Sequence, residues 1–210
     1  MKDNELVKTL FSALDIKDPR LITEIFRFSK VEHISKNSQI VKQHQFIKWF
    51  VIILKGRIRV WQECNERELT LYKIKKHETC VYSIVAIEKD YQSMVNASTL
   101  SDTIILKIPV RFVGEWKKYS SWQEFITTTL IDKYEYLLKA VELLAFKRID
   151  ERILTFLTNS SKETNSREIH ISHNEIAKEI GTTREVVSKS LKVYERKGIL
   201  SLKFKKIKLL

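Results

Sequence analysis

Charged and hydroxyl side chains with the geometry to bind a polyanion cluster in TTREVVSKSLKVYERKG, residues 182–198. On a helix with about 100° between residues, one arc carries Arg184 at its edge, Glu185, Ser188, Lys189 and Lys192. These cationic donors, this carboxylate acceptor and this hydroxyl are the kinds of group that hydrogen-bond base edges in a DNA groove. The solvated face of a purely structural helix has a similar composition, so the neighbouring elements must distinguish the two interpretations.

Start and stop signals divide residues 172–198 into two helices. Two capping boxes are present, Ser172 with Glu175 and Thr182 with Glu185. They predict helices that begin near 173 and 183, while Gly181 and Gly198 stand where each helix must end with a positive φ. The apolar arc expected to pack on the domain carries Val186, Val187, Ser190, Leu191, Val193 and Tyr194. The pattern predicts a helix-turn-helix with a polar outward face.

The end of the chain is strongly basic. The net charge is +12, and residues 189–210 contain eight Lys or Arg residues against one Glu. Such a density favours a polyanionic partner such as nucleic acid, although a solvated surface or a membrane-surface patch is the alternative. The last segment, LSLKFKKIKLL (200–210), alternates like a short hairpin and has no turn glycine.

A long helix is predicted over residues 119–146. Apolar residues recur in steps of four and three at Leu130, Tyr134, Leu137, Val141 and Leu144. This a/d spacing over about two heptads predicts a helix that pairs with its copy in a homodimer. A helix that packs on its own domain is the alternative. A further helix is expected at 148–158, followed by a loop at 159–168.

The first half of the chain changes from helical to strand-like patterns. Helical spacing covers residues 4–30, with Pro19 starting a second helix. From 31 to 110, short runs rich in Val, Ile, Tyr and Trp follow one another at hairpin-like spacing: QIVKQ, KWFVIILKG, RIRVWQE, LTLYKI, VYSIVAI and TIILKIP. These runs predict an antiparallel β-sandwich or roll, with a tight turn at Gly56.

Composition excludes several classes of protein. Apolar residues make up 43% and charged residues 30%, so the chain can bury a core and is not expected to be disordered. Apolar runs such as WFVIIL are far shorter than a membrane helix, and the N-terminus lacks a signal-peptide core, so a cytoplasmic protein without a membrane partner is expected. Cys64 and Cys80 form no disulfide framework and are too few to hold an iron–sulfur cluster alone.

The segment EIAKEIGTTREVVSKSLKVYERKGIL resembles the winged helix-turn-helix of the CRP/FNR family of bacterial transcription regulators. FVIILKGRIRVWQE resembles the opening hairpin of that family's effector β-roll, TIILKIPVRF its closing strand, and RIDERILTFL the helix after the dimer helix. The resemblance implies an α+β chain in three parts. These are an N-terminal antiparallel, cyclic-nucleotide-binding-like β-roll at 1–118, a dimerisation helix at 119–146, and a winged helix-turn-helix at 147–210.

The resemblance also implies roles for individual residues. Base reading falls to Arg184, Glu185 and Lys189, with Ser188 also facing the groove, and phosphate binding falls to His173, Asn174, Thr183 and Lys192. Family members usually carry Arg at the position of Lys189, and Lys lacks the planar fork for bidentate guanine recognition. The implied protein is a homodimer that binds a palindromic operator in double-stranded DNA and also contacts RNA polymerase.

The effector is not identified by sequence. In the cyclic-nucleotide branch, a glycine-rich stretch followed by Arg-Ser grips the phosphate, whereas the corresponding residues 75–99 contain neither glycine nor arginine, and Tyr91–Gln92 stand near the Arg-Ser position. Binding of cAMP or cGMP is therefore not expected, and no cofactor is predicted. The alternatives are a relocated phosphate site at Lys89, a haem ligand at His44 or His77, a small apolar ligand, or no ligand.

Two other functions compete with DNA binding. One is a ligand-binding signalling module that acts through protein contacts, which the basic end disfavours. The other is a metalloenzyme of the cupin type, which needs clustered ligands. The histidines, His33, His44, His77, His170 and His173, are scattered along the chain, and no nucleophile–base pair is evident, so neither a metal site nor an enzyme is expected.

Overall fold

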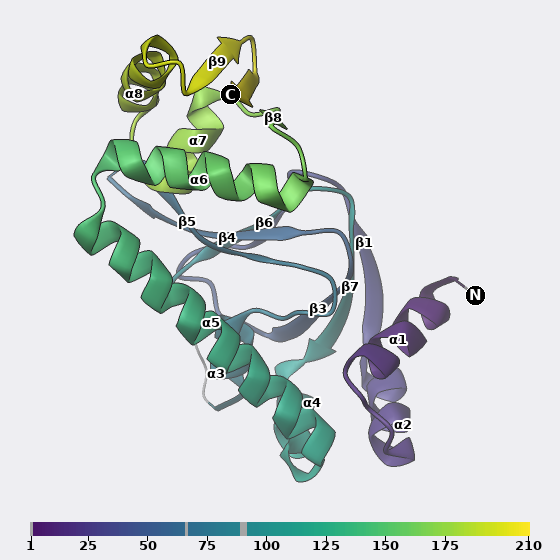
Figure 1. Cartoon of the computed structure of the whole chain (residues 1–210). Coiled ribbons are helices and arrows are strands. Elements are labelled where there is room, and N and C mark those ends of the chain that lie inside the picture. Colours follow the sequence, from purple (N-terminus) through teal and green to yellow (C-terminus); the bar gives the residue numbers. More distant parts are fainter. Residues whose placement is uncertain (1, 66, 89–91) are drawn as a thin grey trace. The chain divides into compact units, whose positions relative to one another are not determined.

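The computed structural model describes residues 2–65, 67–88 and 92–210 (Figure 1). The chain forms two compact units, one of residues 1–61 with 71–137 and one of residues 62–70 with 138–210. Lys89, the alternative phosphate site considered from the sequence, and Tyr91, near the Arg-Ser position, lie outside the described residues.

The first unit is an antiparallel β-roll with helices on its outside. Its elements include α1 (Lys2–Ala13), α2 (Pro19–Phe28), β1 (Lys30–Ile34), β2 (Gln39–Val41), β3 (Trp49–Lys55), β4 (Ile58–Cys64), β5 (Arg67–Ile74), β6 (Asn96–Thr99) and β7 (Thr103–Pro109). The strands form a three-stranded sheet, β1-β7-β3, and a four-stranded sheet, β2-β6-β4-β5 (Figure 1). The predicted β-roll is confirmed.

The strands β3 and β7 have buried residues on both faces of their sheet, which explains the unbroken apolar run of β3. Phe50, Ile52 and Leu54 belong to the core formed with α1, α2 and the buried indole of Trp122. Ile53 belongs to a second core, between the two sheets. A strand that is covered on both faces needs apolar residues at successive positions rather than at alternate ones.

The expectation of a strand at VYSIVAI is wrong, because this run forms α3 (Val81–Glu88). The amides of Ser83 and Ile84 donate to the carbonyl of Cys80, at 3.0 and 3.4 Å, and start the helix. Ile84 packs into the outer core, whereas Tyr82 packs against the core between the sheets. A helix that is buried on several sides is apolar all round, and so resembles a buried strand in sequence.

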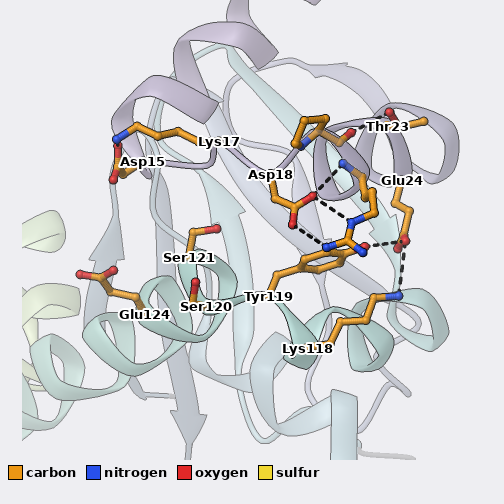
Figure 2. Close-up of a pocket in the computed structure, with 12 residues that line it drawn as sticks. Asp15, Lys17, Asp18, Thr23, Glu24, Lys118, Tyr119, Ser120, Ser121 and Glu124 are labelled. Atoms are coloured by element: carbon orange, nitrogen blue, oxygen red, sulfur yellow. Dashed lines mark hydrogen bonds and ion pairs between the residues drawn. The ribbon is translucent and has the colours of Figure 1, made fainter.

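A hydrogen-bonded carboxylate joins α2 to the chain that leads into α5 (Ser120–Phe146). The short elements α4 (Val110–Val113) and η1 (Gly114–Lys118) precede α5. Glu24 of α2 accepts from Trp116 Nε1 at 2.6 Å. It also accepts from Tyr119 Oη at 2.8 Å and from Lys118 Nζ at 3.4 Å (Figure 2). Desolvation raises the pKa of Glu24, but the hydrogen bonds from Tyr119 and Trp116 outweigh it and hold that pKa below its ordinary value.

The second unit contains α6 (Ile149–Thr164), β8 (Glu168–Ile169), α7 (His173–Ile180), α8 (Arg184–Arg196), β9 (Leu200–Lys203) and β10 (Lys206–Leu209). The expected hairpin at the end of the chain is confirmed as β9–β10, and β8 adds a third strand to it. In the turn, Lys205 adopts the positive φ of 51° for which glycine is usually chosen.

The expected loop at 159–168 is wrong over its first half, because α6 continues to Thr164. Polar residues at this end bond to their own helix: the hydroxyl of Thr158 donates to the carbonyl of Leu154, and that of Thr164 to the carbonyl of Ser160, both at 2.9 Å. Their composition resembles a loop, yet the hydroxyls are satisfied within the helix. Asn165, with φ of 49°, ends it.

Gly56 is confirmed as the turn between β3 and β4. Its φ is 94°, and a Cβ atom at this position would lie 2.5 Å from Thr103 Oγ1 and 2.7 Å from the carbonyl oxygen of Asp102. Gly198 also has a positive φ, of 68°, but no atom lies within 4 Å of a Cβ atom placed there. Gly56 is required both by its positive φ and by the close approach of neighbouring atoms, whereas Gly198 is required by its positive φ alone.

We expect Gly56→Ala to lower the free energy of unfolding by about 3 kcal/mol, because backbone strain and a clash with Asp102 act together. Gly198→Ala is the matched control and should cost only about 1 kcal/mol, the strain of a left-handed residue. Chemical denaturation of the two variants measures the difference. Equal losses would contradict the close approach at Gly56.

Candidate nucleic-acid interface

The tight turn between α7 and α8 is fixed at both ends by capping groups. Ser172 Oγ accepts from the Glu175 amide at 3.2 Å, and the Glu175 carboxylate accepts from the Ser172 amide at 2.7 Å, which confirms the first capping box. Gly181 ends α7 with φ of 75°. The second predicted box is wrong by one residue, because Thr183, and not Thr182, caps α8 by accepting from the Val186 amide.

An arginine that the sequence reasoning missed holds the end of α7. The guanidinium of Arg152 on α6 donates to the carbonyl of Ile180, the last residue of α7. Helix ends leave carbonyl groups without partners, and a cation is a favourable partner for them. Desolvation lowers the pKa of Arg152. The position of Arg152 within RIDERIL does not indicate this role, because the carbonyl that it binds lies far along the chain.

Three buried side chains set the rotation of α8. Val187, Leu191 and Tyr194 are at most 8% exposed and pack with residues of α6 and α7 in the core of the second unit. Two other residues of the predicted apolar arc, Val186 and Val193, are exposed, so the buried arc is narrower than expected. The reason is that a short helix at the surface needs only one stripe of contact with its core.

The opposite side of α8 presents cations that form no ion pair with other residues that the structure describes. The side chains of Arg184, Lys189 and Lys192 are exposed, and none forms an ion pair with another of the described residues. Glu185 is exposed beside them. Its pKa is lowered by hydrogen bonds from its own backbone amide and from Thr183, so it is an ionised acceptor at neutral pH.

His173 and Ser188 are joined by a hydrogen bond that couples the two helices. Ser188 Oγ lies 2.8 Å from His173 Nδ1 and donates to the carbonyl of Arg184 at 2.8 Å. Because the hydroxyl has one proton, Nδ1 of His173 is the donor in this pair. A neutral ring then has no proton on Nε2, and only the protonated ring can donate from Nε2 to a phosphate. Desolvation, with Arg184 and Lys192 nearby, lowers the pKa of His173.

The remaining residues expected to contact DNA lie around this pair. Asn174 is exposed in the first turn of α7, while the Thr183 hydroxyl is engaged at the N-terminus of α8. The hairpin β9–β10 carries Lys203, Lys205, Lys206 and Lys208. The Glu195 carboxylate near the end of α8 accepts from the Leu202 amide at 2.9 Å and so fixes the hairpin to the helix.

The side chains of the expected dimer seam lie on an exposed face of α5. Their exposed fractions run from 40% at Leu130 to 64% at Tyr134, with Leu137, Val141 and Leu144 between these values. Ile131 and Leu138, which the heptad pattern did not include, are exposed as well. We call these seven residues the α5 seam. A contiguous apolar surface of this kind marks an interaction site.

The other side of α5 is fixed to the β-roll. Lys133 Nζ lies 2.8 Å from the Glu78 carboxylate and 5.5 Å from the centre of the Tyr72 ring, and the ring of Tyr136 meets that of Tyr72 edge to face. These contacts fix the rotation of this part of the helix. The α5 seam is therefore not needed for packing within the first unit.

Among the described residues of the first unit, two hollows bear on ligand binding. One, of about 980 Å³, is open and polar and lies between α2 and the start of α5 (Figure 2). Its cations are already paired, Lys17 with Asp15, Arg20 with Asp18 and Lys118 with Glu24, so it offers little free charge for a ligand. The other, of about 460 Å³, lies between the two sheets and is mainly apolar.

No described helix is long and apolar enough to cross a membrane. Among the described residues, no three His, Cys, Asp or Glu side chains gather into a group that could hold a metal ion.

Comparisons with known proteins agree with this geometry. The family model of the Crp-like helix-turn-helix domain matches residues 151–210. No curated protein sequence matches the chain.

Solved structures match over nearly the whole length. A protein assigned to the CRP/FNR regulators of Eubacterium rectale superposes with a TM-score of 0.84 at 22% identity, covering 96% of this chain and 94% of the other. The c-di-GMP-responsive global regulator CLP of Xanthomonas campestris gives 0.80 at 20% identity, covering 91% and 99%. A mutant of CooA from Carboxydothermus hydrogenoformans gives 0.71 at 20% identity, covering 95% and 90%. Residues 151–210 thus match a Crp-like helix-turn-helix domain, and the chain as a whole shares its fold with these solved regulators.

Proposed function

We propose that the protein is a homodimer that binds a palindromic operator in double-stranded DNA, with α8 of each protomer in a major groove. The observation that carries this proposal is the outward row of Arg184, Lys189 and Lys192, which form no ion pair with other described residues and which the buried residues of α8 hold on one side of the helix. Two recognition helices related by a two-fold axis fit half-sites about one helical turn apart, at roughly 10 base pairs centre to centre.

Within the groove, we assign base reading to Arg184, Glu185, Ser188 and Lys189. A guanidinium pairs with guanine O6 and N7, a carboxylate accepts from cytosine N4, and an ammonium donates from a single point. We assign phosphate contacts to His173, Asn174, Thr183 and Lys192, because these residues lie at or near the N-terminal turns of α7 and α8 or on the outward face of α8. The hydrogen bond of Ser188 to His173 gives Ser188 a positioning role as well.

The α5 seam is proposed as the dimer interface. Leu130, Tyr134, Leu137, Val141 and Leu144 recur at heptad spacing on the exposed face, and Ile131 and Leu138 widen it. Helices with apolar residues at a and d positions bury them against a second copy. A dimer of this kind sets the distance between the two recognition helices.

The effector domain is proposed to lack the cyclic-nucleotide phosphate grip. Residues 75–99 contain no glycine for close backbone approach and no arginine for charge, although Tyr91, near the expected Arg-Ser position, lies outside the described residues. Occupancy of the β-roll would act by shifting a population of orientations about the α5–α6 connection at 145–150. We further propose a cytoplasmic protein that contacts RNA polymerase and catalyses no reaction.

Removal of one phosphate-binding cation should weaken DNA binding without changing the fold. We expect Lys192→Ala to lessen the slope of log affinity against log salt by about 0.9, since each neutralised phosphate releases condensed counterions. Lys162→Ala, an exposed lysine on α6, is the control and should leave the slope unchanged. Fluorescence anisotropy on a mixed-sequence duplex measures both. DNA binding that does not depend on salt, or an equal change of the salt slope in both variants, would favour a signalling module that contacts protein.

A charge in the α5 seam should separate the protomers. Val141→Glu replaces a side chain that is 60% exposed in the single chain, so the chain's own core is not disturbed. We expect sedimentation velocity to show a monomer for Val141→Glu and a dimer for the wild type and for Lys139→Glu, an exposed substitution on the same helix. A Val141→Glu protein that sediments like the wild type would place the dimer interface elsewhere.

DNA affinity should rise as the pH falls, because His173 must gain a proton to donate to a phosphate. Its pKa in the free protein lies below the ordinary 6.5, and a bound polyanion raises it, so binding takes up a proton in the range between these two pKa values. One linked proton gives at most about a tenfold change in affinity per pH unit. His173→Gln should remove this part of the dependence, whereas His33→Gln should not. An unchanged pH profile for His173→Gln would refute the assignment.

A further inference from the structure

We propose that the cavity between the two sheets binds an amphipathic anion, an apolar molecule with one carboxylate, whose head group is held by Lys107 with Lys48 nearby. The cavity measures about 460 Å³, within the range of small-molecule sites. Its depth is lined by Ile53, Ile58, Ile74, Val95, Ala97 and Ile105, each of which is at most 5% exposed. These side chains form no hydrogen bonds with a ligand, and they exclude water from its apolar part.

Lys107 is an unusual residue for its position in the sheet. In β7, Leu106 and Ile108 face the core with α1 and α2, whereas Ile105 and Lys107 face the cavity. A cation on an inner face of a β-roll costs desolvation energy unless partners compensate for it. A local departure from the apolar pattern, retained in an otherwise well-packed sheet, is typical of a functional site.

The partners of Lys107 hold its ammonium at the rim of the cavity. Lys107 Nζ lies 3.0 Å from the Glu32 carboxylate and 4.6 Å from the centre of the Trp49 ring. The side chains of Lys107 and Glu32 are 27% and 47% exposed, and Phe46 and Trp49 are exposed beside them. The Lys107 ammonium is therefore placed at the boundary between the apolar depth and solvent, where a carboxylate head group can reach it.

The charges of the lining select an anion over a cation. Among the described lining residues, the cations are Lys48 and Lys107 and the acid is Glu32, which leaves one positive charge in excess. A ligand carboxylate can share the ammonium of Lys107 with Glu32 and also meet Lys48, which forms no ion pair with the described residues. Charge-assisted hydrogen bonds of this kind are stronger than neutral ones.

This head-group site differs in place from the stretch that corresponds to a nucleotide phosphate grip. Glu32 belongs to β1, Lys107 to β7 and Lys48 to the chain just before β3, and none of them lies within residues 75–99. Cys80 and Tyr82, within 75–99, line the cavity from another side, and Glu78 beside them binds Lys133 of α5. Occupancy is thereby connected to the α5 seam helix, and this regulatory part of the inference rests on the proposed function.

The test is calorimetric titration of the full chain, without DNA, with octanoate, octan-1-ol and octylammonium. Octanoate should bind most tightly and octylammonium least tightly. Lys107→Met keeps an apolar stem of similar length. It should lower the affinity for octanoate roughly tenfold and change the affinity for octan-1-ol by less than about twofold. Lys36→Met, an exposed lysine that does not line the cavity, should change neither.

A second variant tests the location of the apolar body. Ala97→Leu adds volume inside the cavity and should weaken both octanoate and octan-1-ol, with thermal melting used to check that it is folded. Shortening the acid from octanoate to hexanoate removes two methylenes and should weaken binding roughly fifteenfold, at about fourfold per methylene. The proposal is overturned if none of the three compounds binds, if octan-1-ol binds as tightly as octanoate, or if Lys107→Met behaves like Lys36→Met. Because the titration contains no DNA, its result does not depend on the proposed operator binding. The two proposals can therefore fail separately.

Discussion

The burial of Val187, Leu191 and Tyr194 is the constraint on which the interface depends. These three side chains fix the rotation of α8 about its axis, and that rotation decides which polar residues face outward. Gly181 provides the positive φ that turns the chain between α7 and α8, while the guanidinium of Arg152 holds the end of α7. The cations of α8 are therefore presented on a rigid support, and recognition does not have to orient the helix at the time of binding.

The β-roll places two surfaces under a similar constraint. Because the outer faces of β3 and β7 pack in the core that supports the helices, their inner faces are left to line a cavity. The contact of Lys133 with Glu78 then directs one side of α5 to the roll and leaves the α5 seam exposed. The same helix thus contacts Glu78, two residues before the lining residue Cys80, through one face, and presents the proposed surface for a second protomer on the other.

Sequence reasoning recovered the elements whose signals are local. The capping box at Ser172, the turn at Gly56 and the a/d spacing of α5 each depend on neighbouring residues, and each was predicted. The helix α3 was mistaken for a strand because burial on several sides removes the period that distinguishes the two. The cap at Thr183, in place of Thr182, was missed because adjacent threonines give the same pattern. The neighbours of Lys107 across the sheet were beyond any local signal.

The central claim is that two copies of α8, held in a dimer, read a symmetric DNA sequence. Selection from a random pool of DNA, by protein stripped of small molecules through partial unfolding and refolding, tests it most directly. The account predicts enrichment of a palindrome with half-sites about 10 base pairs apart, either by the stripped protein alone or once cell extract supplies an effector. Failure to enrich any sequence in both conditions, with no salt-dependent binding to DNA, would contradict it.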